Sequence, residues 1–118
     1  MEPIFNRQGV VVSWLNNEYI HDMRGRAFAF IRSDAIYLYD TTQLGWLRNG
    51  YFRDGRGNAV AFLRGCSGGT LPPLPHLPPL PPLAALPPLP PLPPLSPRAP
   101  LFTRSWSHLS WEEYVGWQ

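Results

Sequence analysis

Lysine is absent from this chain of 118 residues, and cysteine occurs once, as Cys66. A single cysteine excludes an intrachain disulfide, so the fold needs another source of stability. The ten basic residues are all arginines, and against eight acids they leave a net charge of only +2, too weak a balance to indicate nucleic-acid binding. No apolar run reaches 18 residues, and residues 1–7 lack an apolar core. We therefore expect neither a membrane-spanning segment nor a signal peptide, and a cytoplasmic location by default.

Proline is nearly missing from the first 70 residues, because fifteen of the sixteen prolines lie between Pro72 and Pro100. Only the first 66 or so residues can therefore build a packed core, and a domain of that size is marginally stable alone. Composition predicts four parts: a head (3–66), a glycine-rich linker (67–70), a proline-rich rod (71–100) and a tryptophan-rich docking segment (101–118).

A motif of apolar, small, aromatic and aliphatic residues recurs in the head every 16 residues, at 12–15, 28–31, 44–47 and 60–63. Each unit is typical of strand, turn and strand, and Asp22 and Gly25 suit a hairpin loop. The third unit lacks this Asp-x-x-Gly spacing, so we expect a different, tighter turn there. The repeat predicts an all-β fold in which four hairpins, with eight strands, close into a pseudo-fourfold structure without exposed edges.

The repeated columns supply the first candidate binding residues. Strict strand alternation puts positions 12 and 14 on one face and 13 and 15 on the other. The aromatic column is expected to form a ring: Trp14, Phe30, Trp46 and Phe62. Three arginines just past the motif form a basic rim: Arg32, Arg48 and Arg64. This rim suits anionic headgroups or phosphate, or else it is a set of solvated residues flanking turns.

Leucine recurs without a miss at every third position of the rod: Leu71, Leu74, Leu77, Leu80, Leu83, Leu86, Leu89, Leu92 and Leu95. Polyproline II has three residues per turn, so these leucines form one straight stripe on a rod of roughly 90 Å, against a head about 30 Å across. We therefore expect that the rod does not lie wholly on its own head. An apolar stripe needs a cover, which is a neighbouring rod, a groove on another protein or a lipid surface. The alternatives are a disordered linker and a ligand for SH3- or WW-like domains.

The docking segment contains a capping box, in which Ser110 and Glu113 predict a short helix from Trp111 to about Gly116. So short a helix does not persist alone in water, so Trp106 and Trp111 are expected to dock in a socket. A continuous rod favours a socket on another copy, whereas a bend at Ala84-Ala85 returns the segment to its own head.

The chain resembles the four-fold β-flower family, small proteins in which four hairpins radiate as petals around a shallow barrel. The resemblance rests on residues 9–15, 19–31 and 51–69, and on the Leu-Pro repeat that leads to Ser105-Trp106-Ser107 and Ser110-Trp111-Glu112-Glu113. It implies a shape but no catalytic residues. The fold is distantly similar to tubby and scramblase barrels, which by analogy implies membrane or lipid association.

The sequence contains no recognisable set of catalytic residues. The three histidines lack metal-ligand spacing, Cys66 has no positioned base, and no phosphate-binding loop or catalytic triad is present. We therefore expect no cofactor, no metal and no enzymatic activity. The sequence favours a structural or assembly protein that forms a homo-oligomer or filament through its rod and docking segment. The alternatives are a peripheral membrane or lipid-binding module and a proline-rich ligand for a partner protein, with no role in nucleic-acid binding.

Overall fold

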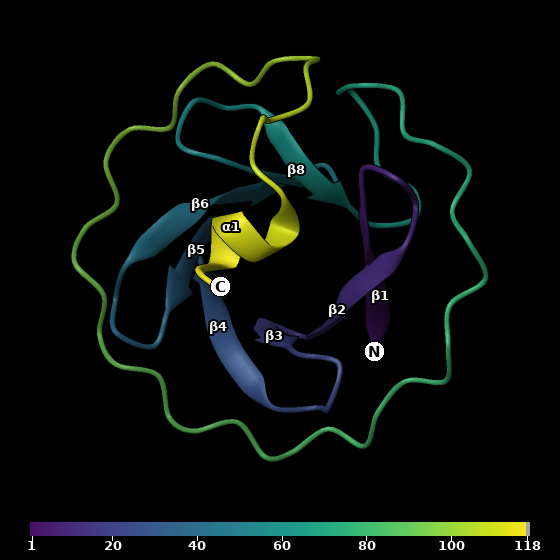
Figure 1. Ribbon diagram of the computed structural model, residues 1–118. Coiled ribbons are helices and arrows are strands. Elements are labelled where there is room, and N and C mark those ends of the chain that lie inside the picture. The colour runs from purple at the N-terminus through teal and green to yellow at the C-terminus, as the bar shows by residue number, and fades with distance from the viewer. Residues whose placement is uncertain (118) are drawn as a thin grey trace.

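The computed structural model describes residues 1–117, and most of its first half forms a closed antiparallel barrel (Figure 1). Each strand pairs with the next along the chain, and β1 pairs with β8 to close the ring. The strands are β1 (Glu2–Asn6), β2 (Val11–Asn16), β3 (Tyr19–His21), β4 (Ala27–Arg32), β5 (Ala35–Leu38), β6 (Gln43–Arg48), β7 (Tyr51–Arg53) and β8 (Ala59–Phe62). The predicted all-β class and eight-strand closure are confirmed.

A β-bulge recurs in every second strand at the 16-residue interval. In β2, Ser13 pairs with Ile4 and Val11 pairs with Phe5, which leaves Val12 without a partner. Equivalent bulges in β4, β6 and β8 leave Phe28, Leu44 and Val60 without a partner. A bulge re-aims the extra residue, and these four side chains pack on the central core. The strict alternation expected from the sequence, which put positions 12 and 14 on one face, is wrong for this reason.

The loops inside the four hairpins share one set of backbone hydrogen bonds. In the second loop, the Gly25 N–H donates to the Asp22 carbonyl at 3.0 Å, and Gly25 adopts a φ of 90°. The Asp22 Oδ1 atom also accepts from the N–H groups of Arg24 and Arg26 at 2.9 and 3.0 Å. The third loop keeps the same backbone bonds, since the Thr41 N–H donates to Leu38 at 2.9 Å, with Thr41 itself at a φ of 71°. The tighter turn expected there is therefore wrong: the loop keeps its geometry with a strained threonine in place of glycine.

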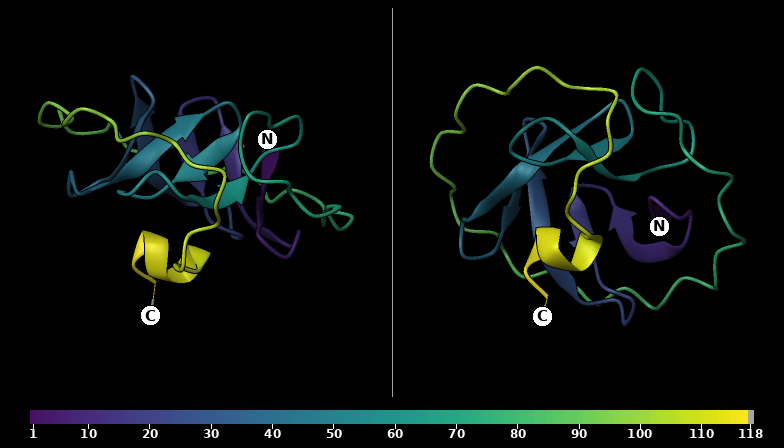
Figure 2. Two further views of the ribbon diagram at one scale, coloured as in Figure 1. Left: turned by 90° about the horizontal axis from the view of Figure 1, so that it is seen from above. Right: turned by 45° about the horizontal axis from the view of Figure 1, so that its top comes forward.

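A single helix, α1 (Trp111–Val115), plugs one end of the barrel, while the N-terminus lies toward the other end (Figure 2). The central core contains fully buried isoleucines and phenylalanine from the odd-numbered strands: Ile4, Ile20, Ile36 and Phe52. Trp111 packs among them, and its Nε1 donates to Ser13 Oγ at 3.0 Å. The predicted helix and its capping box are confirmed, and the segment docks on the head of its own chain.

Residues 71–100 run around the outside of the barrel and form neither helix nor strand (Figure 1). The whole molecule measures only 36 × 35 × 26 Å, so the expectation of a straight rod that leaves its own head is wrong. At the polyproline II rise of about 3.1 Å per residue, these 30 residues cover roughly 93 Å, which is most of the perimeter, roughly 110 Å, of a disc 36 Å across. The length that matters is the perimeter of the head and not its diameter. Gln118, the last residue of the expected docking segment, lies outside the described residues.

Candidate functional site: the leucine belt

The segment around the barrel, residues 71–103, is called the belt here, and backbone hydrogen bonds fix it to three of the four hairpin loops. The N–H of His76 donates to the Gly9 carbonyl at 2.8 Å, that of Ala85 to Gly25 at 2.9 Å, and that of Thr103 to Gly57 at 3.1 Å. Proline has no N–H, so each of these bonds requires a residue other than proline. His76 and Ala85 thus stand where the prolines are interrupted because the belt is anchored there.

These anchors follow a nine-residue period that matches the 16-residue period of the head. From 76 the period passes through 85 and 94 to 103, one position for each loop. Position 94 is a proline, and the third loop holds the belt through side chains. The hydroxyl of Tyr37 donates to the Pro94 carbonyl at 3.3 Å, and that of Tyr39 donates to the Pro88 carbonyl at 3.0 Å. Sequence reasoning missed these anchors, although the nine-residue spacing of the interruptions was a visible signal.

The loop glycines let the belt backbone come close. A Cβ added to Gly9 would lie 2.9 Å from the Leu74 carbonyl oxygen, and one added to Gly25 would collide with the equivalent oxygen of Leu83. Both glycines also have positive φ values, of 82° and 90°. Gly9 and Gly25 therefore have two roles: they allow the positive φ of the loop, and they leave room for the backbone of the belt.

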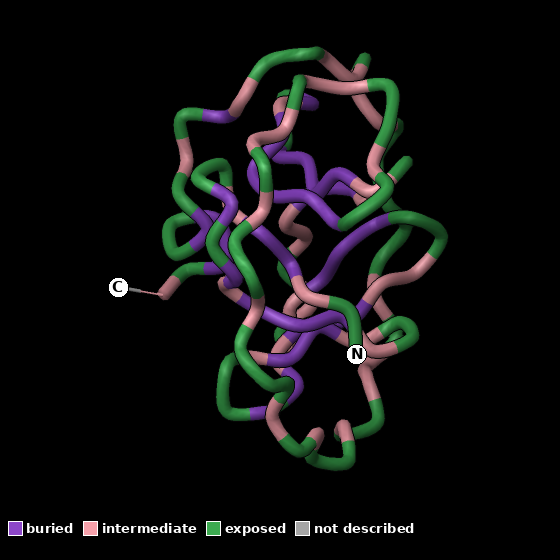
Figure 3. Tube along the Cα trace, turned by 90° about the vertical axis from the view of Figure 1, so that its right-hand side faces the viewer, coloured by how far each residue is buried: buried purple, intermediate pink, exposed green. Residues whose placement is uncertain are grey.

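The leucines of the belt point away from the barrel into solvent. The nine predicted stripe leucines are 89–99% exposed, and Leu101 is 91% exposed. The proline that follows most of them is half-buried instead, as at Pro72, Pro75, Pro87 and Pro90. Figure 3 shows exposed and half-buried stretches alternating along the belt, outside the buried strands. The structure thus keeps the three-residue stripe of the sequence but bends it into an apolar rim.

The predicted aromatic ring is buried, half of it beneath the belt residues Ala99 and Phe102 and half beneath Cys66 and Trp106. Trp14 and Phe62 belong to one outer cluster, against which Trp106 packs, and Phe30 and Trp46 belong to a second. Each of the four is at most 7% exposed. These residues are therefore core in this structure, and they bring the belt and the barrel together.

The three arginines of the predicted basic rim each pack on an aromatic ring. The Arg32 guanidinium sits 5.5 Å from the Phe30 ring, and that of Arg48 sits 5.0 Å from the Phe102 ring. Arg64 similarly covers Phe5 at 5.5 Å. Arg48 also forms an exposed ion pair with Asp34 at 3.4 Å, a contact of small energetic value. The three arginines do not converge on one point.

The two predicted docking tryptophans hold the end of the chain to the barrel differently. Trp111 is 1% exposed and fills the core, whereas Trp106 is half-buried, 6.2 Å from the Phe62 ring. The backbone around Trp106 bonds to the barrel, because Ala59 donates to Ser105 at 3.0 Å and accepts from Ser107 at 2.7 Å. Both tryptophans are thus structural contacts within one chain.

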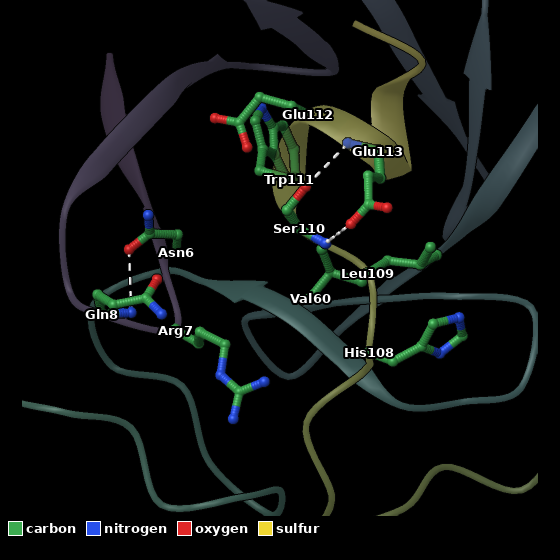
Figure 4. A pocket seen from close by; sticks show the side chains of 10 residues that line it. All are labelled: Asn6, Arg7, Gln8, Val60, His108, Leu109, Ser110, Trp111, Glu112 and Glu113. Atoms are coloured by element: carbon green, nitrogen blue, oxygen red, sulfur yellow. Dashed lines mark hydrogen bonds between the residues drawn. The ribbon is translucent and has the colours of Figure 1, made fainter. Parts of the chain in front are cut away.

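A polar pocket of about 200 Å³ lies at the start of α1, between this helix and the first hairpin loop (Figure 4). Two of its polar residues, Ser110 and Glu113, bond to each other. Ser110 Oγ accepts from the Glu113 N–H at 3.1 Å, and the Ser110 N–H donates to Glu113 Oε1 at 2.9 Å. These bonds hold the pKa of Glu113 below its usual range. This end of the pocket is therefore the capping box of α1.

Other chemistry is sparse in the described part of the chain. Residues 1–117 bring no three His, Cys, Asp or Glu side chains together as a metal site would require. Helical structure long and apolar enough to cross a membrane is not found in the same residues. The buried His21 has an Nδ1 atom 2.8 Å from the Gly25 carbonyl oxygen, within its own hairpin loop. The exposed leucine rim is thus the strongest candidate for a functional surface.

Comparison with family models matches residues 2–115 to the family described as 4-fold beta flower protein. Searches of curated proteins and of solved structures each found no match. The family match spans the barrel, the belt and the helical plug together.

Proposed function

This chain belongs to the 4-fold beta flower protein family, and on that premise we propose that it is a non-enzymatic assembly protein whose leucine belt associates side by side with the belts of other copies. In this proposal the belt adopts polyproline II geometry around four petal-like hairpins. The observation that carries it is the exposure of the nine stripe leucines, at 89–99%. So large an apolar surface on one rim is unusual for a protein that stays alone.

The belt suits a second copy because it is uncharged and periodic. Between Leu71 and Pro97 the belt has no Asp, Glu or Arg, so it offers no charge pattern to select a different partner. Leucines that recur every three residues lie roughly 9 Å apart in polyproline II, which leaves a gap into which a leucine of a facing belt fits. Identical belts are therefore complementary to one another in either direction.

The curvature of the rim determines how strong one contact is. Two convex rims touch over a short arc, and on the order of three leucines from each copy meet at a spacing of roughly 9 Å. Burying six leucines contributes about 9 kcal/mol at the low end of the usual range, which is comparable with the 4–15 kcal/mol cost of association. One contact is therefore weak, and stable assembly requires several neighbours around each rim.

A flat membrane is the less suitable cover for this surface. The leucines run around the barrel, so a plane meets only one arc of them at a time, as the ring in Figure 1 indicates. Copies packed side by side cover several arcs at once. A partner that recognises polyproline is also disfavoured, because many of the belt prolines are half-buried against the barrel.

Sedimentation velocity of the full chain over a hundredfold concentration range tests the proposal. We expect the mass to increase with concentration, to decrease in the variant Leu80→Ser, Leu83→Ser, Leu86→Ser, and to be that of a monomer when all nine stripe leucines are serine. Arg24→Ser with Arg26→Ser is the matched control, since it alters exposed residues off the belt and should leave association unchanged. Melting temperatures should change little in any variant, because exposed side chains contribute within about 0.5 kcal/mol to stability.

A monomeric parent at every concentration would overturn the proposal. If that monomer floats with neutral phosphatidylcholine vesicles and the nine-serine variant does not, the belt is a membrane surface instead. If the parent and the nine-serine variant both bind vesicles, the belt serves neither association nor membrane binding.

A further inference from the structure

The fourth hairpin contains a buried arginine where the other three hairpins have none. Arg53 is 2% exposed, and the equivalent positions are Phe5, His21 and Tyr37. Its guanidinium lies between two rings, 5.1 Å from that of Tyr51 and 4.9 Å from that of Phe102. A buried positive charge at this one hairpin requires compensation.

The described residues compensate Arg53 only in part. Its Nη1 donates to the carbonyls of Gly57 and Thr103, each at 2.7 Å, and its Nε has no partner in residues 1–117. Ion pairs to Arg53 are likewise not found within these residues. The neighbouring Asp54 is engaged elsewhere, because its Oδ1 accepts from the N–H groups of Arg56 and Asn58 and its Oδ2 accepts from Ser107. Two neutral carbonyls are thus the polar partners of a buried cation, and burial lowers the pKa of Arg53.

An open cavity lies above this arginine, at the place where the two ends of the belt meet. The start and end of the belt approach each other beside β8 in Figure 1. A cavity of about 420 Å³ is lined there by Tyr51, by residues 66–72 and by Arg104. Gly69 separates it from Arg53, since a Cβ added to Gly69 would lie 2.8 Å from the Arg53 Nη2 atom. The guanidinium therefore lies directly behind Gly69, outside the lining of the cavity.

The lining of the cavity contains one arginine, Arg104, and no acidic residue. From Gly55 to Trp111 the chain has no acidic residue, but it contains Arg56, Arg64, Arg98 and Arg104. The backbone N–H groups of Gly68, Gly69 and Thr70 have no hydrogen-bond partner within the described chain. Gly68 has a φ of 76°, the left-handed conformation that one residue of an anion-binding nest of successive N–H groups adopts.

We propose that this cavity binds a small phosphate-class anion, held by Arg104 and by the backbone N–H groups of residues 68–70, with the Arg53 charge buried directly behind Gly69. The anion supplies the negative charge that the buried guanidinium lacks, and the guanidinium and amide donors match phosphate oxygens. The site lies at the junction of the belt, so binding also fixes both ends of the belt to the barrel. The ligand is free phosphate or a phosphate monoester, which present the same oxygens.

Titration of the full chain with sodium phosphate, against sodium chloride at matched ionic strength, tests this site. The amide NMR signals of Gly68, Gly69 and Thr70 should shift with phosphate, and the melting temperature should rise with phosphate but not with chloride. Arg104→Ser should weaken phosphate binding about tenfold or more, as expected for loss of a charge-assisted contact. Arg24→Ser, an exposed arginine at the second loop, is the matched control and should bind like the parent. Glycerol 3-phosphate in a second arm shows whether a monoester binds more tightly than free phosphate.

Equal melting temperatures in phosphate and chloride would overturn the proposal. So would shifts that appear only at the loop of Arg24 and Arg26, or an unchanged affinity in Arg104→Ser. The variant Arg53→Gln serves as a second probe if it folds: it removes the buried charge, so phosphate should no longer stabilise it.

Discussion

A chain that ends at Gly69 is expected to lose its cooperative unfolding transition. The truncation removes Trp111, Tyr114 and Val115 from the central core and uncovers the outer aromatic clusters around Trp14 and Phe30. Loss of one buried tryptophan already costs about 3–5 kcal/mol, and a domain of this size has only about 5–15 kcal/mol in total. The barrel without its belt and plug should therefore not hold a single packed state.

Thermal melts followed by near-ultraviolet circular dichroism, together with binding of a hydrophobic dye, measure this effect. The full chain with serine at Leu80, Leu83 and Leu86 is the control, because those side chains are exposed and their loss should leave the melt intact. A truncated chain that melts cooperatively at the temperature of the full chain would show that the barrel folds alone.

Ala85→Pro is expected to destabilise the protein by about 1–3 kcal/mol, the usual cost of leaving a carbonyl without its hydrogen-bond partner. The substitution removes the N–H that donates to the Gly25 carbonyl at 2.9 Å, one of three backbone anchors of the belt. Ala84→Pro is a matched control one residue away, since the Ala84 N–H makes no hydrogen bond in the described chain. That control should be neutral or slightly stabilising, because proline restricts the unfolded chain.

Urea unfolding of the two proline variants beside the parent gives the comparison directly. Hydrogen exchange at the second hairpin loop should also accelerate in Ala85→Pro alone. Equal free energies of unfolding for the two variants would mean that the anchor at Gly25 contributes nothing.

Repetition made the barrel predictable. A motif that returns every 16 residues requires equivalent environments, and four such units can bury their apolar faces by closing into a ring. The capping box at Ser110 and Glu113 was predictable for a similar reason, because both residues satisfy local backbone groups that any helix start exposes.

Features that depend on contacts between distant residues were not predictable in the same way. The bulge at Val12 depends on how β2 pairs with Ile4 and Phe5 of β1. Strict alternation along a strand assumes that every residue has a partner, so it does not predict a residue without one. Thr41 takes a positive φ because the rest of its loop keeps the geometry of the other three, against its own preference.

The path of the belt was mispredicted because the proline-rich segment was treated as straight. Its length fits around the head, and the interruptions at His76 and Ala85 mark where the loop carbonyls accept a hydrogen bond. The sequence likewise suggests the aromatic column as binding residues, but Phe102 of the belt and Trp106 after it pack on this column. The stripe of leucines was predictable, but the direction in which it faces required the fold.

Small-angle X-ray scattering of the nine-serine variant, in which belt association is removed, tests most directly whether the belt encircles its own barrel. The wrapped chain has a Cα radius of gyration of 13.3 Å and a longest extent of 36 Å, so a compact scattering profile close to these dimensions is predicted. A straight polyproline II rod would extend roughly 90 Å from the head and would give a much larger maximum dimension. A maximum dimension near the length of the rod would contradict the wrapped belt and, with it, the outward leucine rim.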